Sequence, residues 1–358
     1  MTRRIAPGLL LCLLAAPSAQ AAGAEAAPVA AFRAECAAKY EAAVKADTMT
    51  VAGADGWLFF HNELRHLSVG EFWGEKAVQV SRATAGQDPL PAILDYQASC
   101  RKLGIELVLL PVPPKAIVYA DKLSDEVKPD ARGVPPRLDI AHQAFYKLLR
   151  EKGVTVLDLT DDLLAARAEK GSEPVFCKQD THWSGRACGI AARKIAELVQ
   201  GRDWVKAIPR KTYDTQATPV QISGDLWRAM KGTKPPAESV TLRLVGTKGA
   251  LGPTPIEPDP ASPVLLLGDS HGLVFHMGGE MHATGAGLVD QMAFEFGCPM
   301  ELIAVMGSGA TPARISLYRK QRRIEGYLKT KKLIVWCFAA REFTESSGWR
   351  EVPVTREN

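Results

Sequence analysis

Short apolar runs alternate with amphipathic segments along most of this chain. The runs rich in Val, Ile and Leu, which predict strands, are 105–112, 154–159, 264–267, 302–306 and 332–338. Apolar residues at helical spacing occupy 91–103, 136–151, 185–200 and 312–330, and a further helix is expected directly after Ser270. Apolar strands separated by helices are typical of a parallel sheet that is covered on both faces. The pattern therefore predicts one α/β domain.

Three segments lie outside this alternation. The segment from Ala24 to Lys45 carries charges at helical spacing and predicts a solvent-facing helix or a tether. Residues 53–60 predict a turn that leads into a strand, because an Asp-Gly pair precedes the aromatic residues. Residues 204–263 are rich in Pro, Thr, Lys and Gly and predict a long excursion across the surface. The expected organisation is a helix or tether at 22–49, a domain at 50–345 and a tail at 346–358.

The N-terminus has the pattern of a secretory signal. Arg3 and Arg4 precede an apolar stretch at 9–16, and Ala19-Gln20-Ala21 offers a small-x-small cleavage site. An uncleaved membrane-anchoring helix is the alternative, but the apolar core is short and Pro17 interrupts it. We therefore expect residues 1–21 to be a signal peptide.

Composition narrows the function classes. The 358 residues are 46% hydrophobic and 23% charged, which is ordinary for a globular protein. Lys and Arg number 44 against 40 Asp and Glu, and no basic stripe is interleaved with aromatics, so no nucleic-acid partner is expected. Beyond the leader, no apolar run reaches the roughly 20 residues that a membrane span needs.

Cysteine usage fits export without defining a site. The seven cysteines, less Cys12 of the leader, leave an even number for an oxidising compartment. Sequence does not choose a pairing among them, and no C-x-x-C pair indicates a zinc ribbon or a thioredoxin-type site. The remaining six are Cys36, Cys100, Cys177, Cys188, Cys298 and Cys337.

Two short segments could carry chemistry. Ser270 directly follows an apolar strand, at the end of the sheet where open α/β folds bind ligands. Asp180 and His182 lie two residues apart, so on an extended backbone they project to the same side. In a catalytic triad, His182 would take the proton of Ser270, and Asp180 would orient the imidazole. No metal or cofactor is required.

Other interpretations of these segments remain open. Gly-Asp-Ser is common in turns that cap helices, and Ser184 could cap the helix that begins at Gly185. The two Asp/His pairs Asp180–His182 and Asp269–His271 could instead form a metal site. A non-catalytic role follows if Ser270 and His182 are far apart. Further candidates for substrate binding or site support are Asp269, His271, Ser308 and Arg341, the last followed by Glu342 after the final strand.

Five motifs in order resemble the SGNH-hydrolase-like domain of the alginate acetylation proteins AlgJ and AlgX. The resemblance spans roughly residues 50–345 and is closer to single-domain members. The motifs are the turn and strand at 53–60, Asp180-Thr181-His182-Trp183, Gly224-Asp225-Leu226, Gly268-Asp269-Ser270 and the segment Trp336 to Glu342. His271 departs from the pattern, because many relatives have an aromatic residue there. The oxyanion-hole Asn of standard SGNH esterases has no counterpart, which leaves backbone N–H groups near Ser270 for that role.

The resemblance implies an SGNH-hydrolase-like fold and a periplasmic O-acetyltransferase. In that family a Ser-His-Asp triad, here Ser270, His182 and Asp180, moves acetyl through an acyl-serine onto an exported polysaccharide. The implied partners are an alginate-like or other exopolysaccharide acceptor and a membrane-bound O-acyltransferase protein that relays the acetyl donor. A carbohydrate acetylesterase with the same triad and a non-catalytic subunit of an export complex are the alternatives.

Overall fold

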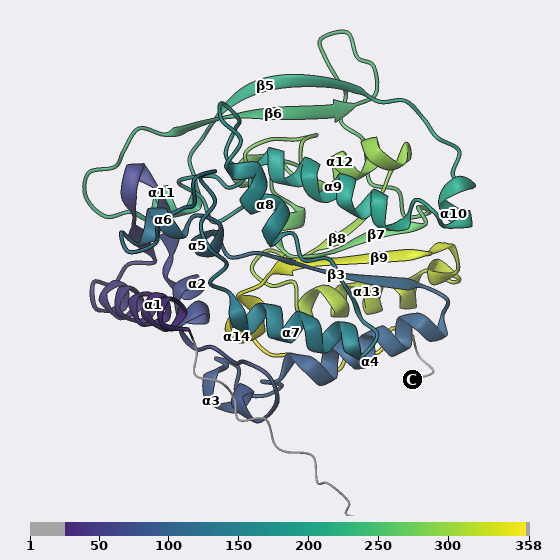
Figure 1. Cartoon of the computed structure of the whole chain (residues 1–358). Helices are drawn as coiled ribbons and strands as arrows, with labels where there is room; N and C mark the ends of the chain where they lie inside the picture. Colours follow the sequence, from purple (N-terminus) through teal and green to yellow (C-terminus); the bar gives the residue numbers. More distant parts are fainter. Residues whose placement is uncertain (1–25, 356–358) are drawn as a thin grey trace, which may run out of the picture.

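A parallel sheet of five strands forms the centre of the molecule (Figure 1). The computed structural model describes residues 26–355, so the signal peptide expected at 1–21 lies outside the described residues. The strand order is β4-β3-β9-β7-β8, and all pairs are parallel. The strands are β3 (Glu106–Val112), β4 (Thr155–Val156), β7 (Val264–Gly268), β8 (Glu301–Ala304) and β9 (Leu333–Ala339). The predicted α/β sheet is confirmed, although the strand expected at 154–159 is reduced to two residues.

Helices cover both faces of this sheet, as Figure 1 shows. One face carries α8 (Thr160–Arg167), α9 (Gly185–Val199) and α12 (Leu288–Phe296), and the other carries α4 (Pro89–Lys102), α7 (Ile140–Glu151) and α13 (Thr311–Arg323). Alternate residues of β9 enter the two apolar clusters: Val335 and Cys337 belong to one, Ile334 and Trp336 to the other. Every residue of β9 is buried, which explains why its sequence is continuously apolar rather than alternating.

The N-terminal helix packs on the domain. The predicted helix forms as α1 (Ala27–Lys45), which lies against α2 (His61–Ser68). One side of α1 is buried through Val29, Phe32 and Cys36, so it is not wholly solvent-facing. The turn expected at 53–60 leads into β2 (Leu58–Phe60), which pairs antiparallel with β1 (Thr50–Ala52). The short helices are α3 (Ala77–Val80), α5 (Lys115–Val118), α6 (Ala120–Leu123), α10 (Asp203–Lys206) and α14 (Glu342–Glu345).

The predicted surface excursion contains an ordered hairpin. Strands β5 (Asp214–Ile222) and β6 (Glu238–Gly246) pair antiparallel above α9 and α12 (Figure 1). The short helix α11 (Asp225–Ala229) lies in the connection that joins the two strands. Most of β5 is exposed and Pro219 interrupts its apolar pattern, so the sequence lacks the usual strand signals. After the hairpin, residues 247–263 lead the chain into β7, and Ser270 follows that strand.

The prediction of a helix directly after Ser270 is wrong. A single 3-10 turn at Ser270–Gly272 follows β7, and α12 begins only at Leu288. The intervening loop is rich in left-handed backbone, since Gly278 and Gly279 have φ of 70° and 56°. Similarly, the helix predicted at 312–330 ends at Arg323, because Ile324 adopts an extended backbone, and a short 3-10 turn follows at Tyr327–Thr330.

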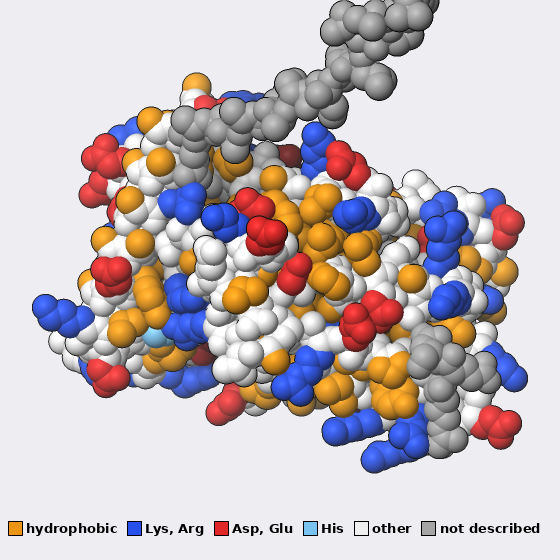
Figure 2. Space-filling view, turned by 90° about the horizontal axis from the view of Figure 1, so that it is seen from below, with side chains coloured by type: hydrophobic (Ala, Val, Ile, Leu, Met, Phe, Trp, Pro, Cys, Tyr) orange, Lys and Arg blue, Asp and Glu red, His pale blue; other side chains and the backbone are white. Residues whose placement is uncertain are grey.

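The remaining surface and terminal features are simple. Acidic and basic side chains are interspersed over the face in Figure 2. Between residues 26 and 355, none of the helices combines the length and the apolar character that crossing a bilayer requires.

All six cysteines of this part of the chain are unpaired. Of the predicted tail, Trp349, Val352 and Val354 are buried against the domain.

Candidate active site

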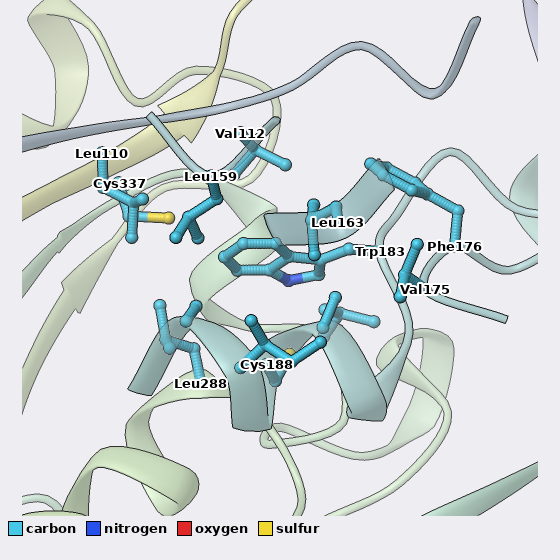
Figure 3. Close-up of a cluster of buried hydrophobic side chains, with 14 of the residues drawn as sticks. Leu110, Val112, Leu159, Leu163, Val175, Phe176, Trp183, Cys188, Leu288 and Cys337 are labelled. Carbon is cyan, nitrogen blue, oxygen red and sulfur yellow. The ribbon is translucent and has the colours of Figure 1, made fainter. Parts of the chain in front are cut away.

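The loop that carries Asp180 and His182 is held in the core by the next residue, Trp183. Its side chain is fully buried, and Figure 3 shows the indole between Leu159 and Leu163 on one side and Cys188 on the other. The indole Nε1 donates to the backbone oxygen of His271, 3.1 Å away. Trp183 is therefore a packing residue that joins the two candidate segments.

Ser270, His182 and Asp180 form one hydrogen-bonded chain. The Oγ of Ser270 lies 2.8 Å from Nε2 of His182, and Nδ1 of His182 lies 2.6 Å from Oδ1 of Asp180. The backbone N–H of His182 also donates to Oδ1 of Asp180 at 2.9 Å, so the two residues lie on a bend and not on the extended backbone expected from the sequence. Only 8% of Ser270 is exposed, so its oxygen lies in a largely desolvated position. The structure brings together the three residues that the sequence singled out.

The pKa values of Asp180 and His182 suit proton transfer from Ser270. Burial alone would raise the pKa of Asp180, but His182 and His282 outweigh it and hold the pKa well below its usual range. Burial lowers the pKa of His182, but the Asp180 carboxylate outweighs it and raises the pKa above the ordinary value. With Nδ1–H donating to the carboxylate, the neutral imidazole presents Nε2 as an acceptor for the Ser270 proton.

His282 and Asp225, which sequence analysis did not assign to the site, complete the shell around Asp180. Oδ2 of Asp180 accepts from Nε2 of His282 and from the backbone N–H of Asp225, both at 2.9 Å. The Asp225 carboxylate accepts from the backbone N–H and the hydroxyl of Thr181, at 2.8 and 2.6 Å. The Gly224-Asp225-Leu226 segment was a signal for Asp225. No local pattern pointed to His282, because the fold alone brings it here.

Gly224 is required for this close approach. A Cβ atom at Gly224 would lie 2.1 Å from the backbone oxygen of Gln179 and 2.8 Å from Cβ of Asp180. Real Cβ contacts are never that short, so a side chain here would displace one of the two loops. The glycine thus lets the 224–226 segment dock on the loop of Asp180.

Lys115, also not assigned from the sequence, supports the loop from below. It follows β3, is 1% exposed, and its Nζ donates to the backbone oxygens of Cys177, Lys178 and Asp180 at 3.0, 3.2 and 2.7 Å. Burial lowers the pKa of Lys115, against the opposing effects of the Glu63 and Asp180 charges. The ammonium satisfies three carbonyl groups that would otherwise be buried without partners.

Asp269 and His271 lie at the site but are buried beneath Ser270. Asp269 accepts from the backbone N–H of His271 and of Ala339, both at 2.8 Å, and ties the 3-10 turn to the end of β9. Burial would raise the pKa of Asp269, but His271 and these donors lower it to about 2. The His271 ring lies 4.9 Å from the His182 ring, centre to centre. Both residues support the turn.

Arg341 and Ser308 lie at the same edge of the sheet. The hydroxyl of Ser308 donates to Oε2 of Glu342 at 2.8 Å, and the guanidinium of Arg341 lies over the Phe60 ring, 5.2 Å from its centre. Burial, with the charge of Asp269, raises the pKa of Glu342 to about 7. Neither Ser308 nor Arg341 contacts the three-residue chain through a hydrogen bond.

The two Asp/His pairs do not converge on one point as the suggested metal site would require. Within residues 26–355, the group whose ligand atoms converge is Asp180, His182 and Asp225, without Asp269 and His271. In that group, both ring nitrogens of His182 and both oxygens of each carboxylate already make hydrogen bonds. Hydrogen bonding therefore accounts for the cluster.

Comparison with known proteins identifies the same region. Residues 50–339 match the family model described as SGNH hydrolase-like domain, acetyltransferase AlgX. The probable alginate O-acetylase AlgJ of Pseudomonas putida is 26% identical over 230 residues, which cover 62% of this chain and 54% of that protein. The protein of the same name from Pseudomonas fluorescens is 24% identical over 229 residues, covering 62% and 52%. The chain thus spans about half the length of these curated relatives.

Solved structures share the fold. The O-acetyltransferase domain of Pseudomonas putida AlgJ matches with a TM-score of 0.59 and 22% identity, over 82% of this chain and 92% of that one. Pseudomonas aeruginosa AlgX matches with a TM-score of 0.56 and 18% identity, over 89% and 70%. At these identities the likeness concerns the fold, and it agrees with the predicted SGNH-hydrolase-like class.

Proposed function

This chain belongs to the family of SGNH hydrolase-like, AlgX-type acetyltransferase domains, and from that premise we propose that it is an O-acetyltransferase acting on a secreted polysaccharide. The observation that carries the proposal is the unbroken chain from Ser270 Oγ through His182 to Asp180, with distances of 2.8 and 2.6 Å. A nucleophile, its base and the group that orients the base are the elements of acyl transfer through serine.

The proposed reaction has two halves. Nε2 of His182 takes the hydroxyl proton as Ser270 Oγ attacks the acetyl carbonyl, and the leaving oxygen of the donor receives that proton as its bond to the acetyl breaks. A polysaccharide hydroxyl then gives its proton to His182 and attacks the acetyl-serine, and His182 passes that proton to Ser270 Oγ as the bond between Oγ and the acetyl group breaks. Asp180 stays ionised throughout and stabilises the imidazolium that forms in each half.

The hydrogen bonds of the 3-10 turn limit which backbone N–H groups can act as the oxyanion donor. The backbone N–H of His271 already donates to Asp269, so it is not free for a developing oxyanion. The backbone N–H of Ser270 is the donor that we propose at this position, out of the backbone N–H groups near Ser270 that the sequence left for this role. Asp269 and His271 act by holding the turn.

The acceptor and the donor follow from the family. The relatives named alginate O-acetylase support a polyuronate or similar exopolysaccharide as acceptor. A membrane-bound O-acyltransferase protein is the proposed relay of the acetyl donor. Export by a signal peptide at 1–21 would place the domain at 50–345 in the periplasm, where such a polymer passes.

Acetyl transfer to a sugar tests this proposal. The purified protein is incubated with a chromogenic acetyl ester, with and without a short uronate oligosaccharide, and both ester cleavage and the mass of the sugar are measured. We expect Ser270→Ala to abolish ester cleavage, while wild type also adds acetyl to the sugar. Cleavage without any acetylated sugar would indicate an esterase, and unchanged cleavage by Ser270→Ala would refute the triad.

A further inference from the structure

Asp180 lies between two histidines. Its Oδ1 faces Nδ1 of His182 at 2.6 Å, and its Oδ2 faces Nε2 of His282 at 2.9 Å. The His282 side chain is 5% exposed, so this second contact is shielded from water much as the first is. The proposed triad does not use His282, which reaches the site from the opposite side of the carboxylate.

The loop that delivers His282 has an unusual backbone. Phe275 and His282 adopt left-handed φ values of 60° and 74°, and neither is glycine. Such residues store backbone strain, which persists where the surroundings determine the conformation strongly. Here the loop is fixed by backbone hydrogen bonds from Phe275 to Met281 and from Ala286 to Phe275, at 2.8 and 2.9 Å. The rings of Phe275 and His282 also pack together, 5.8 Å apart.

We propose that His282 is a positioning residue that extends the triad to a Ser270–His182–Asp180–His282 chain. The inference rests on the proposed function. The donor on Oδ2, together with the backbone N–H of Asp225, prevents the carboxylate from rotating about its Cβ–Cγ bond. Oδ1 is then held toward Nδ1 of His182, which keeps the imidazole in the tautomer that accepts from Ser270.

The other charges near Asp180 define what His282 adds. Lys115 lies beneath the same loop with its ammonium 2.7 Å from the Asp180 backbone oxygen, and Asp225 and Glu238 contribute negative charge from the 224–238 region. Of the side chains described, His182 and His282 are the two that hydrogen-bond to the carboxylate itself. Loss of the His282 donor therefore leaves the Asp180 charge less compensated, and this draws the His182 proton more tightly.

Three variants test the proposal on the full chain. His282→Leu removes the donor, His282→Gln keeps an N–H that can reach Oδ2, and His276→Gln changes a histidine of the same loop that pairs with Asp290 instead. We expect His282→Leu to lower kcat for a chromogenic acetyl ester about tenfold or more. Its acid limb of kcat/KM should shift to higher pH. His282→Gln should recover part of kcat, and His276→Gln should match wild type.

A second readout separates positioning from folding. The rate at which a sulfonyl fluoride labels Ser270 should fall in His282→Leu as kcat does, while the melting temperature stays within a few degrees of wild type. His282→Leu with wild-type kcat and pH profile overturns the proposal. The proposal is also overturned if His282→Leu and His282→Gln lose kcat to the same extent and both have a lower melting temperature, because the role of His282 would then be structural. An active Ser270→Ala protein would instead refute the proposed function.

Discussion

A carboxylate remains ionised inside a protein when enough donors surround it, and Asp180 meets this condition with four hydrogen bonds. Its charge in turn raises the pKa of His182, against the opposing effect of burial. A general base works only in its neutral form, so a higher pKa moves the onset of activity to higher pH.

The pH profile of kcat/KM follows from this pair. His182 is protonated and inactive below its pKa, so we expect activity to rise with pH, with a midpoint above the ordinary histidine value of about 6.5. Asp180→Asn removes the charge and should lower that midpoint as well as kcat. Initial rates with an acetyl ester from pH 5 to pH 9 give both values. A wild-type midpoint below the ordinary value would contradict the assignment of His182 as the base.

Glu342 predicts a pH-dependent stability. Its pKa is about 7 in the folded protein against 4.5 as the ordinary value, chiefly through burial. As pH rises from about 4.5 to about 7, the unfolded chain loses this proton and the folded chain retains it, so stability falls. The loss is about 3 kcal/mol at most and is absent below the lower value. Glu342→Gln should remove it, as followed by denaturant unfolding at several pH values.

The exposed Glu351 provides the matched control for that experiment. Glu351→Gln should leave the pH dependence of the unfolding free energy unchanged. A difference between wild type and Glu342→Gln that stays constant from pH 4 to pH 8 would count against a raised pKa at Glu342.

At this scale, local sequence identified some residues of the site and not others. Asp180 and His182 lie two residues apart in one short motif, and Ser270 follows an apolar strand, so each has a pattern to find. Lys115 and His282 reach the same carboxylate loop from positions 65 and 102 residues away. Neither has a local pattern, because only the tertiary fold creates their contacts.

Among the elements, the segment at 224–226 can dock on the Asp180 loop only because residue 224 is a glycine without a side chain. Gly224→Ala would place a Cβ 2.1 Å from the Gln179 oxygen, which forces the Asp180 loop or α11 to move. We expect a loss of ester cleavage well beyond the loss of melting temperature, because Asp180 loses the Asp225 N–H first. Gly201→Ala is the control, since nothing lies within 4 Å of its added Cβ. Full activity in Gly224→Ala would mean that the Asp225 contact does not matter.

The predictability of elements followed their burial. Strands β3, β7 and β9 have both faces covered and are continuous apolar runs, so the sequence identified them. The β5–β6 hairpin is stabilised by pairing and by one partly buried face, which leaves little apolar signal. The helix expected after Ser270 does not form because the left-handed residues of the 273–287 loop cannot continue a helix.

For the whole molecule, the leader makes a separate prediction. Expression of the full sequence in a Gram-negative host should yield a periplasmic protein whose first residue is Ala22, because cleavage follows Ala19-Gln20-Ala21. N-terminal sequencing of the periplasmic fraction checks this. Ala21→Arg should block cleavage and shift the protein to the membrane fraction. A mature protein that begins at Met1 would contradict the expected signal peptide.

The arrangement of the molecule brings the site together from distant parts of the chain. Ser270 follows β7, which lies between β9 and β8, while His182 and Asp180 come from the loop before α9. The segment between β5 and β6 contacts Asp180 through the backbone N–H of Asp225. The central claim is that this assembly makes Ser270 an acyl carrier. That claim is independent of which polymer accepts the acetyl group.

Mass spectrometry of an acetylated Ser270 peptide tests this claim most directly. The protein is mixed briefly with an activated acetyl ester without acceptor, quenched in acid and digested. We predict the mass of one acetyl group on the peptide that contains Ser270, loss of that mass when an oligosaccharide acceptor is added before quenching, and no label in His182→Ala. An unlabelled Ser270 peptide during active ester turnover would contradict the account.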